Sequence, residues 1–378
     1  MNKRVFLDNA ATTPIAPEII ELISDMMKTH FANPSSIHSY GRESKIIVES
    51  ARKKIANLLN TSPGSIFFTS GGTEADNMAI KCAINDHKIT HAITSKLSHH
   101  AVLYPLEDLE KEGKIKLSYI NTDENGLICL KHLEELLKNN KRTFVSIMHA
   151  NNEIGTIQPI KEIGELCLKY KAVFHCDTVQ TMAHYPIDLQ ELNVDFITGS
   201  AHKFHGPKGV GFIYISDNIT IKPFISGGSQ ERNMRAGTEN VHAIAGLSKA
   251  MELSYENMLN DKKHITEIKK YMIEQLVKNI SDVKFNANCT NFDNSLFKIL
   301  SVSFPKISES EMLLFNLDIH GISCSGGSAC SAGNMSGSHV LDEICKDKDR
   351  TGVRFSFSRY NTKEEIDYTV QKIKEIFS

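Results

Sequence analysis

Residues 199–209 read Gly-Ser-Ala-His-Lys-Phe-His-Gly-Pro-Lys-Gly, a stretch that indicates both the fold and the chemistry of the chain. The apolar run 196–198 before it predicts a strand, and the Gly-Pro-Lys-Gly sequence at its end predicts a turn. A lysine at a strand end among polar neighbours suits a Schiff base with a carbonyl compound, provided that its pKa is lowered. Lys203 is therefore a candidate nucleophile, with an ordinary surface lysine as the alternative. Lys208, inside the turn, is expected to face solvent.

On both sides of this segment, short apolar runs alternate with amphipathic stretches. One amphipathic stretch, 44–59, places Ile47, Ala51 and Ile55 on one helical face. Such alternation predicts an α/β fold with a mostly parallel sheet covered by helices on both faces. The functional groups would then gather at the carboxyl ends of the strands. The predicted strands cover 66–68, 91–94, 144–147, 172–175, 196–198 and 209–215.

The pattern changes after Gly237. Residues 242–280 contain no proline and predict one or two long helices, and the chain ends in a predicted helix that Thr362 and Glu365 begin with capping-box spacing. We expect a large domain at 15–255. A smaller α+β domain is expected to combine 1–14 with 256–378.

Composition excludes several classes of protein. The 43 Lys and Arg residues nearly balance the 45 Asp and Glu residues, which argues against a nucleic-acid binder. No apolar run approaches the roughly 18 residues that span a bilayer, and the apolar patch near the N-terminus is too short for a secretory signal. The eight cysteines form no C-x-x-C pair and are expected to be reduced thiols. A cytoplasmic enzyme without a membrane or nucleic-acid partner is the leading class.

Three further segments at strand ends carry groups that suit a flat, phosphorylated cofactor. Asp177 could hold a pyridinium nitrogen protonated, as pyridoxal phosphate (PLP) requires, or could merely cap a helix. The Gly71-Gly72-Thr73 turn before a helix could bind an anion through backbone N–H groups, or could be an ordinary turn. One of His99 and His100 could stack on the ring and exchange protons, although a lone histidine can equally be structural.

Two segments in the C-terminal part suit the substrate. Residues 323–338 are rich in Ser and Gly, which is typical of a mobile loop, and Cys330 in its middle is the better candidate for an exposed nucleophile than Cys324. An accidental surface thiol is the alternative. Arg354 alternates with apolar residues, which suits a strand that presents a guanidinium to a carboxylate or to a partner within the protein.

The order and spacing of these segments resemble the PLP-dependent cysteine desulfurases (NifS/IscS type) of the class V aminotransferase group. The resemblance runs from Leu7 to Tyr368. Its most specific matches are 149–155, 200–209, 235–240 and 327–330. It implies the fold of the PLP-dependent transferases of fold type I and implies no metal.

The resemblance also implies the role of each residue toward the cofactor. Lys203 would form the Schiff base with PLP, Asp177 would pair with the pyridine nitrogen, and His99 would stack on the ring. The remaining cofactor contacts would come from Gly72, Thr73, Asn152, Gln180, Ser200 and His202, together with Thr238 from a partner subunit. A homodimer with shared active sites is therefore expected.

For the substrate, the resemblance implies that Asn152 and Arg354 bind the carboxylate of L-cysteine. Cys330 would take the sulfur as a persulfide, leaving L-alanine, and would pass it to acceptor proteins of iron–sulfur cluster, thio-cofactor or tRNA-thiolation pathways. The alternatives are transamination, a lyase specific for selenocysteine, and a scaffold that keeps the fold without catalysis. A scaffold would be expected to have lost Lys203 or Asp177, and both are present.

Overall fold

A seven-stranded sheet forms the centre of the larger part of the molecule. The computed structural model describes all residues except 1–3, 307–311, 327–337, 346, 348 and 378. Neighbouring strands in the sheet are parallel, except that β8 is antiparallel to both β2 and β7. In spatial order the strands are β2 (Ile66–Thr69), β8 (Gly211–Ile215), β7 (Phe196–Ser200), β6 (Val173–Asp177), β5 (Thr143–Met148), β3 (His91–Thr94) and β4 (Lys116–Tyr119).

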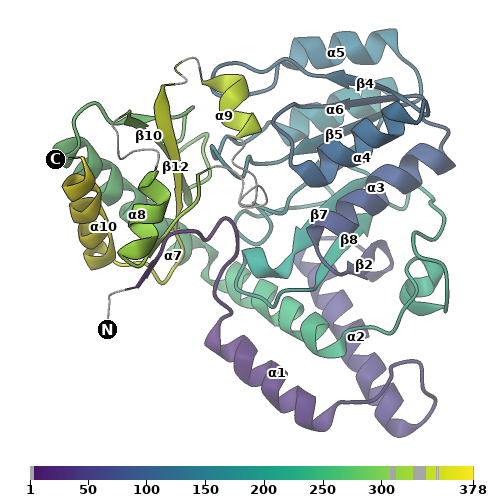
Figure 1. Ribbon diagram of the computed structural model, residues 1–378. Coiled ribbons are helices and arrows are strands. Elements are labelled where there is room, and N and C mark those ends of the chain that lie inside the picture. Colours follow the sequence, from purple (N-terminus) through teal and green to yellow (C-terminus); the bar gives the residue numbers. More distant parts are fainter. Residues whose placement is uncertain (1–3, 307–311, 327–337, 346, 348, 378) are drawn as a thin grey trace.

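Helices cover both faces of this sheet (Figure 1). One face packs against α3 (Gly72–Asp86) and α4 (His100–Lys111) in a single apolar cluster. The other face packs, in a second cluster, against α1 (Pro17–Thr29), α2 (Ser39–Leu58), α5 (Leu130–Asn139), α6 (Ile160–Tyr170) and the first part of α7 (Val241–Asn279). The predicted α/β architecture with a mostly parallel sheet is therefore confirmed.

The smaller part is built on an antiparallel three-stranded sheet. Its strands, in spatial order, are β12 (Arg350–Ser356), β10 (Ile299–Pro305) and β9 (Lys284–Phe285), while β1 (Val5–Phe6) pairs in parallel with β11 (Ile322–Ser323). The helices here are α8 (Leu313–Ile319), α9 (His339–Ile344) and α10 (Lys363–Ile376), together with the last part of α7. Thr362 and Glu365 form the predicted capping box of α10.

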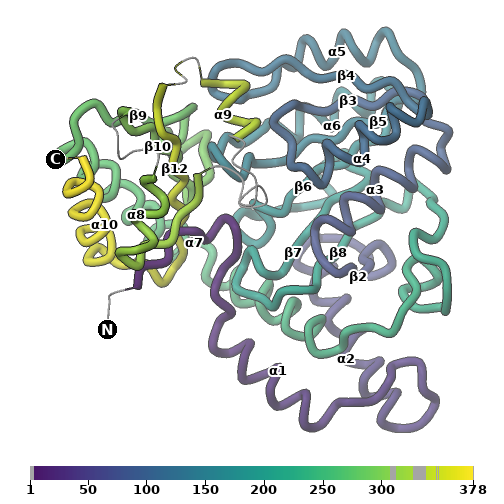
Figure 2. The backbone as a smooth tube through the Cα atoms, viewed as in Figure 1, coloured from purple at the N-terminus to yellow at the C-terminus, as the bar shows by residue number. Residues whose placement is uncertain are grey.

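The apolar clusters support the predicted division into two domains, which we retain as a proposal. The first part of α7, through Met251, packs in the core of the larger part, whereas Ile265 and later residues pack in the core of the smaller part. Val5 and Leu7 also belong to the smaller core. Figure 2 shows the N-terminal segment crossing from one part to the other.

In the larger part, one strand was not expected and one helix begins earlier than expected. β4 was not expected, because its exposed and half-buried residues give it little apolar pattern, with only Leu117 buried. Helix α2 begins at Ser39, five residues before the expected start at Ser44, because His38 caps it by accepting a hydrogen bond from the N–H of Gly41. Among the helices in the described ranges, none is long and apolar enough to cross a membrane.

Candidate active site

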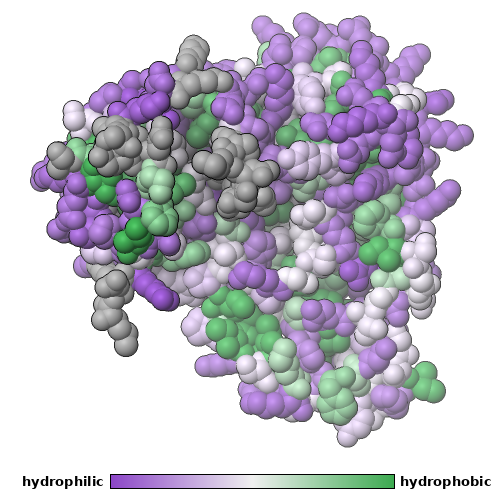
Figure 3. Space-filling view, viewed as in Figure 1, coloured by the Kyte–Doolittle hydropathy of each residue, from purple (hydrophilic) through white to green (hydrophobic). Residues whose placement is uncertain are grey.

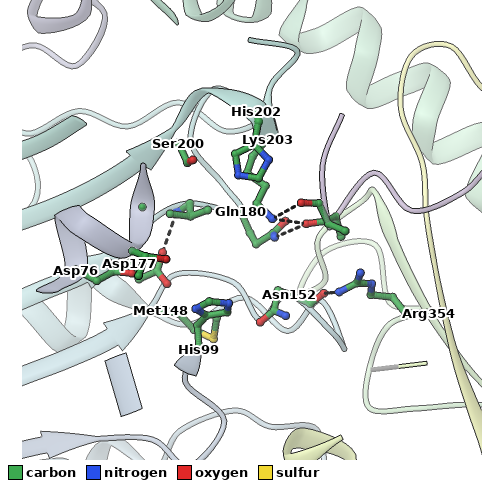
Figure 4. Close-up of a pocket in the computed structure, with 15 residues that line it drawn as sticks. Asp76, His99, Met148, Asn152, Asp177, Gln180, Ser200, His202, Lys203 and Arg354 are labelled. Carbon is green, nitrogen blue, oxygen red and sulfur yellow. Dashed lines mark hydrogen bonds between the residues drawn. The ribbon is translucent and has the colours of Figure 1, made fainter. Parts of the chain in front are cut away.

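A cavity opens where β5, β6 and β7 end, on the side that faces the smaller part (Figure 4). Met148, Asp177 and Ser200 are the last residues of these three strands, so the parallel sheet brings them to one edge. The predicted site residues that line this cavity are Gly72, Thr73, His99, Asn152, Asp177, Gln180, Ser200, His202, Lys203 and Arg354.

Lys203 enters the cavity from a single turn of 3-10 helix, Ala201–Lys203, directly after β7. Its Nζ donates hydrogen bonds to the backbone oxygens of Ala10 (2.7 Å) and Ala11 (2.8 Å). The N-terminal segment is held against this turn because the backbone N–H of Thr13 donates to the oxygen of His202 at 2.8 Å. The carbonyl groups of residues 10 and 11 are therefore the hydrogen-bond acceptors of the lysine amine.

Asp177 lies buried at the end of β6. Its Oδ1 accepts a hydrogen bond from the N–H of Val179 at 2.9 Å. The pKa of this carboxyl is raised to about 7, mainly by burial and also by the neighbouring Asp76, while Val179, His175 and Lys203 act in the opposite direction. A carboxyl with this pKa is only partly ionised near neutral pH and needs an additional cationic group beside it to be fully ionised. A protonated pyridine nitrogen would be such a group.

His99, and not His100, faces the cavity. It caps α4 by accepting a hydrogen bond at Nδ1 from the N–H of Ala101 (3.1 Å), which leaves the ring proton on Nε2. Burial, together with the charge of Lys203, lowers the pKa of His99 to about 4, so the ring is neutral at pH 7. His100 instead stacks on Tyr104 with ring centroids 4.6 Å apart.

The start of α3 provides a cradle for an anion. Gly72 begins this 15-residue helix, whose free N–H groups and dipole favour negative charge. A Cβ atom at Gly72 would lie 2.7 Å from Cγ2 of Val179, so only glycine fits here. Thr73, Ser200 and His202 line the cavity in addition. These donors fit a phosphate group.

Arg354 is buried on β12 and reaches the cavity from the smaller part. Its Nη2 lies 2.7 Å from Oδ1 of Asp8, and its Nη1 donates to the backbone oxygen of Asn152 at 2.9 Å. The buried Nε has no hydrogen-bond partner in the described part of the chain. The contacts with Asp8 and Asn152 thus orient the guanidinium, and its Nε–H remains as a donor for a carboxylate.

Of the predicted site residues that the structure describes, Thr238 is not brought into this cavity. Thr238 is exposed, between Asn233 and the start of α7, and does not line the cavity. Cys330 lies outside the described residues. The outer turn residue Lys208 is exposed, as predicted, and Cys176 is buried in the core.

The sequence analysis missed five residues that line the cavity: Ala10, Ala11, Asp76, Met148 and Val179. A signal existed for Asp76, because it follows Thr73 by three residues and therefore lies on the same helical face as the anion cradle. No signal existed for Ala10 and Ala11, because they contribute backbone carbonyl groups.

Comparison with known proteins identifies the family. The family model "Aminotransferase class-V" matches residues 5–369. The chain belongs to the class-V aminotransferases. A relative in this family, "Cysteine desulfurase IscS" of Dictyoglomus turgidum, is 44% identical, and the match covers 100% of this chain and 95% of that protein.

Solved structures agree with this assignment to the class-V aminotransferases. A "NIFS-LIKE PROTEIN" superposes with a TM-score of 0.90 at 37% identity, covering 99% of both chains. A structure described as "SspA in complex with cysteine" superposes with a TM-score of 0.81 at 31% identity, covering 95% of this chain and 100% of that chain. The chain therefore belongs with the cysteine desulfurases among the class-V aminotransferases, as the sequence resemblance implied.

Proposed function

We propose that this chain is a PLP-dependent cysteine desulfurase that converts L-cysteine to L-alanine and carries the sulfur as a persulfide on Cys330. The observation that carries the proposal is the meeting of Lys203, Asp177 and Arg354 in one cavity. An amine, a carboxylate and a guanidinium are the groups that a PLP enzyme needs for the aldehyde, the pyridine nitrogen and the substrate carboxylate. The full-length similarity to proteins named cysteine desulfurase supports the choice of reaction.

The residues around the cavity fit PLP. Lys203 would bind its aldehyde carbon, Asp177 its pyridine nitrogen and Gln180 its ring hydroxyl. The neutral ring of His99 would stack on the cofactor, and the start of α3 with Thr73, Ser200 and His202 would hold the phosphate. When bound, the cofactor supplies an electron sink next to the substrate's Cα.

Lys203 is suited to move the Cα proton. Its amine donates hydrogen bonds to the carbonyl oxygens of Ala10 and Ala11, which hold it in place within the cavity. The neutral His99 has a donor at Nε2 and can exchange a proton with a substrate group in the same cavity. Both side chains are half-buried, which limits the competition of bulk water for these protons.

Arg354 and Asn152 would hold the substrate carboxylate. Because Asp8 and the Asn152 carbonyl fix two sides of the guanidinium, Arg354 would hold the carboxylate in a restricted orientation. The thiolate of Cys330 then attacks the substrate sulfur. The new S–S bond forms as the Cβ–S bond breaks, and the electron pair of the broken bond stays with the carbon skeleton, which is protonated to alanine.

A homodimer is part of this proposal. Thr238, which is exposed and away from its own chain's cavity, would complete the phosphate site of the partner subunit. Exposed apolar side chains gather over α1 and α2, where Figure 3 shows hydrophobic surface, and they would be covered by a second copy of the chain. They are Ile20, Met27, Phe31, Ile37 and Ile46.

The sulfur acceptor and the location complete the proposal. The persulfide of Cys330 would pass its outer sulfur to a transient acceptor protein, such as an iron–sulfur scaffold or a tRNA-thiolation enzyme. A cytoplasmic location remains a prediction that cell fractionation tests.

The test is an absorbance scan of the purified protein, followed by addition of L-cysteine with sulfide and alanine assays. Wild type should show a visible cofactor band that Lys203→Ala lacks, and should form sulfide and alanine in equal amounts under reducing conditions. Cys330→Ala should keep the band and lose sulfide and alanine formation to near background. Full activity in Cys330→Ala would reject the persulfide step and leave a PLP lyase or aminotransferase.

A further inference from the structure

Two buried carboxyl groups lie side by side in the cavity, and the proposed function uses only one of them. Asp177 ends β6, and Asp76 is on α3, one turn after Thr73; their exposed fractions are 6% and 2%. Figure 4 shows the two side chains next to each other. Two ionised carboxylates in one buried site repel each other strongly, so such a site holds one negative charge and one proton.

Asp76 faces an imidazole. Its Oδ1 lies 3.4 Å from Nε2 of His175, and both side chains are buried. Neither of these two atoms has a hydrogen-bond partner among the described residues. The other ring nitrogen, Nδ1, lies 2.8 Å from Oγ of Ser146, a hydroxyl that can accept a hydrogen bond from Nδ1–H or donate one to Nδ1. With the ring proton on Nδ1, a proton on Asp76 satisfies Oδ1 and Nε2 together, whereas with the ring proton on Nε2 the ring itself donates to an ionised Asp76.

Asp177 is placed differently. It accepts the N–H of Val179 at 2.9 Å, and the charge of Lys203 favours its ionised form. The remaining titratable neighbour is Cys176, whose side chain points to the opposite face of β6 and whose thiol pKa is raised well above its ordinary value, so it carries no charge. Thr198 lowers the pKa of Asp76, whereas Val179, His175 and Lys203 all lower the pKa of Asp177, so more of the surrounding groups favour the charge on Asp177 and the proton on Asp76.

The pKa values agree with this geometry. Burial raises the pKa of Asp76 and of Asp177 to about 7, so that burial alone does not decide which one ionises. Burial lowers the pKa of His175 to about 4, so its ring is neutral and Nε2 is available as an acceptor.

We propose that His175 holds the shared proton on Asp76, and that this placement leaves the negative charge of the site on Asp177, where it pairs with the pyridine nitrogen of the cofactor. The inference rests on the proposed function, because it concerns the residue proposed to hold that nitrogen. Asp76 and His175 are positioning residues, since both act through Asp177.

The test measures how strongly the holoenzyme retains PLP as the pH is lowered. Wild type, Asp76→Asn, His175→Leu and the double variant are dialysed over a pH series, and the pH at which half of the cofactor is lost is read from the visible band. Leucine cannot accept a hydrogen bond from protonated Asp76, so in His175→Leu part of the negative charge moves from Asp177 to Asp76. Asp177 then pairs less well with the pyridine nitrogen, and the half-loss pH should rise by about one unit. Asp76→Asn removes the carboxyl that competes with Asp177 for the negative charge, so this variant should have a lower half-loss pH than wild type. Adding Asp76→Asn to His175→Leu should return the half-loss pH to the wild-type value or below.

The matched control is His91→Leu, a buried histidine on β3 that does not line the cavity and should leave the half-loss pH unchanged. Circular dichroism at each pH separates loss of cofactor from unfolding. The inference is overturned if His175→Leu does not raise the half-loss pH. It is also overturned if the double variant has the same raised half-loss pH as His175→Leu alone. Wild type without retained PLP would instead overturn the proposed function.

Discussion

Lys298 is a buried lysine for which the proposed reaction has no role. Its side chain is 1% exposed, and Nζ has no hydrogen-bond partner in the described part of the structure. Burial lowers its pKa well below the ordinary value, and the charges of Lys203 and Arg354 act in the same direction. A buried amine without a partner costs free energy that an apolar side chain of similar length does not.

We therefore expect Lys298→Met to increase the free energy of unfolding by about 1 kcal/mol or more. Chemical denaturation of the two proteins checks this, with the exposed Lys208→Met as a control that should change stability by less than about 0.5 kcal/mol. A clear loss of stability in Lys298→Met would mean that the amine has a stabilising partner.

Arg354→Lys tests the orientation of the substrate carboxylate. Lysine keeps the positive charge but cannot contact Asp8, the Asn152 carbonyl and a carboxylate at once. KM for L-cysteine should rise by about tenfold or more, with a smaller change in kcat and an unchanged visible cofactor band. A tenfold loss in kcat with an unchanged KM for L-cysteine would contradict a role of Arg354 in substrate binding.

At the scale of elements, α10 offers a test of local stability far from the cavity. The Thr362 hydroxyl accepts the N–H of Glu365 at 3.4 Å, and the Glu365 carboxylate accepts the N–H of Thr362 at 3.1 Å. Thr362→Ala should lower the free energy of unfolding by about 1 kcal/mol, and Thr362→Ser should retain most of the stability. Thermal denaturation measures both. Desulfurase activity at 25 °C should be unaffected in either variant, because α10 packs only in the smaller core.

At the scale of the whole molecule, buried histidines predict a pH-dependent stability. Burial lowers the pKa of six of them to about 4, so between pH 6.5 and pH 4 the unfolded chain binds protons that the folded chain does not. Stability contributed by these groups is therefore lost as the pH falls through this window. They are His91, His99, His149, His175, His202 and His205.

Buried acids act in the opposite direction, because the stability they contribute is lost as the pH rises through their raised pKa values. Burial raises the pKa of Asp76 and Asp177 to about 7, and it also raises the pKa of Glu153, Asp195, Glu239 and Asp261. Burial also lowers the pKa of His100 and His184, so the histidines outnumber these acids and should prevail. We expect Tm to rise between pH 5 and pH 7, as measured by differential scanning calorimetry, and a flat or falling Tm would contradict this balance.

The amino-acid sequence alone indicated the alternation of strands and helices in the larger part and most of the candidate site. Lys203, Asp177 and the turn at Gly72 each follow a short apolar run, and a local pattern of this kind is readable without knowing what packs beside it. The parallel arrangement then places such strand ends together. Their meeting in one cavity was therefore predictable from the sequence.

Only the tertiary structure decided the features that depend on distant contacts. It selected His99 over His100, since burial against the cavity does not follow from two adjacent histidines. It brought the Ala10 carbonyl to Lys203, 193 residues away, with no side chain to announce the contact. It also placed Asp76 beside His175, because the packing of a helix on a sheet sets which buried charges become neighbours.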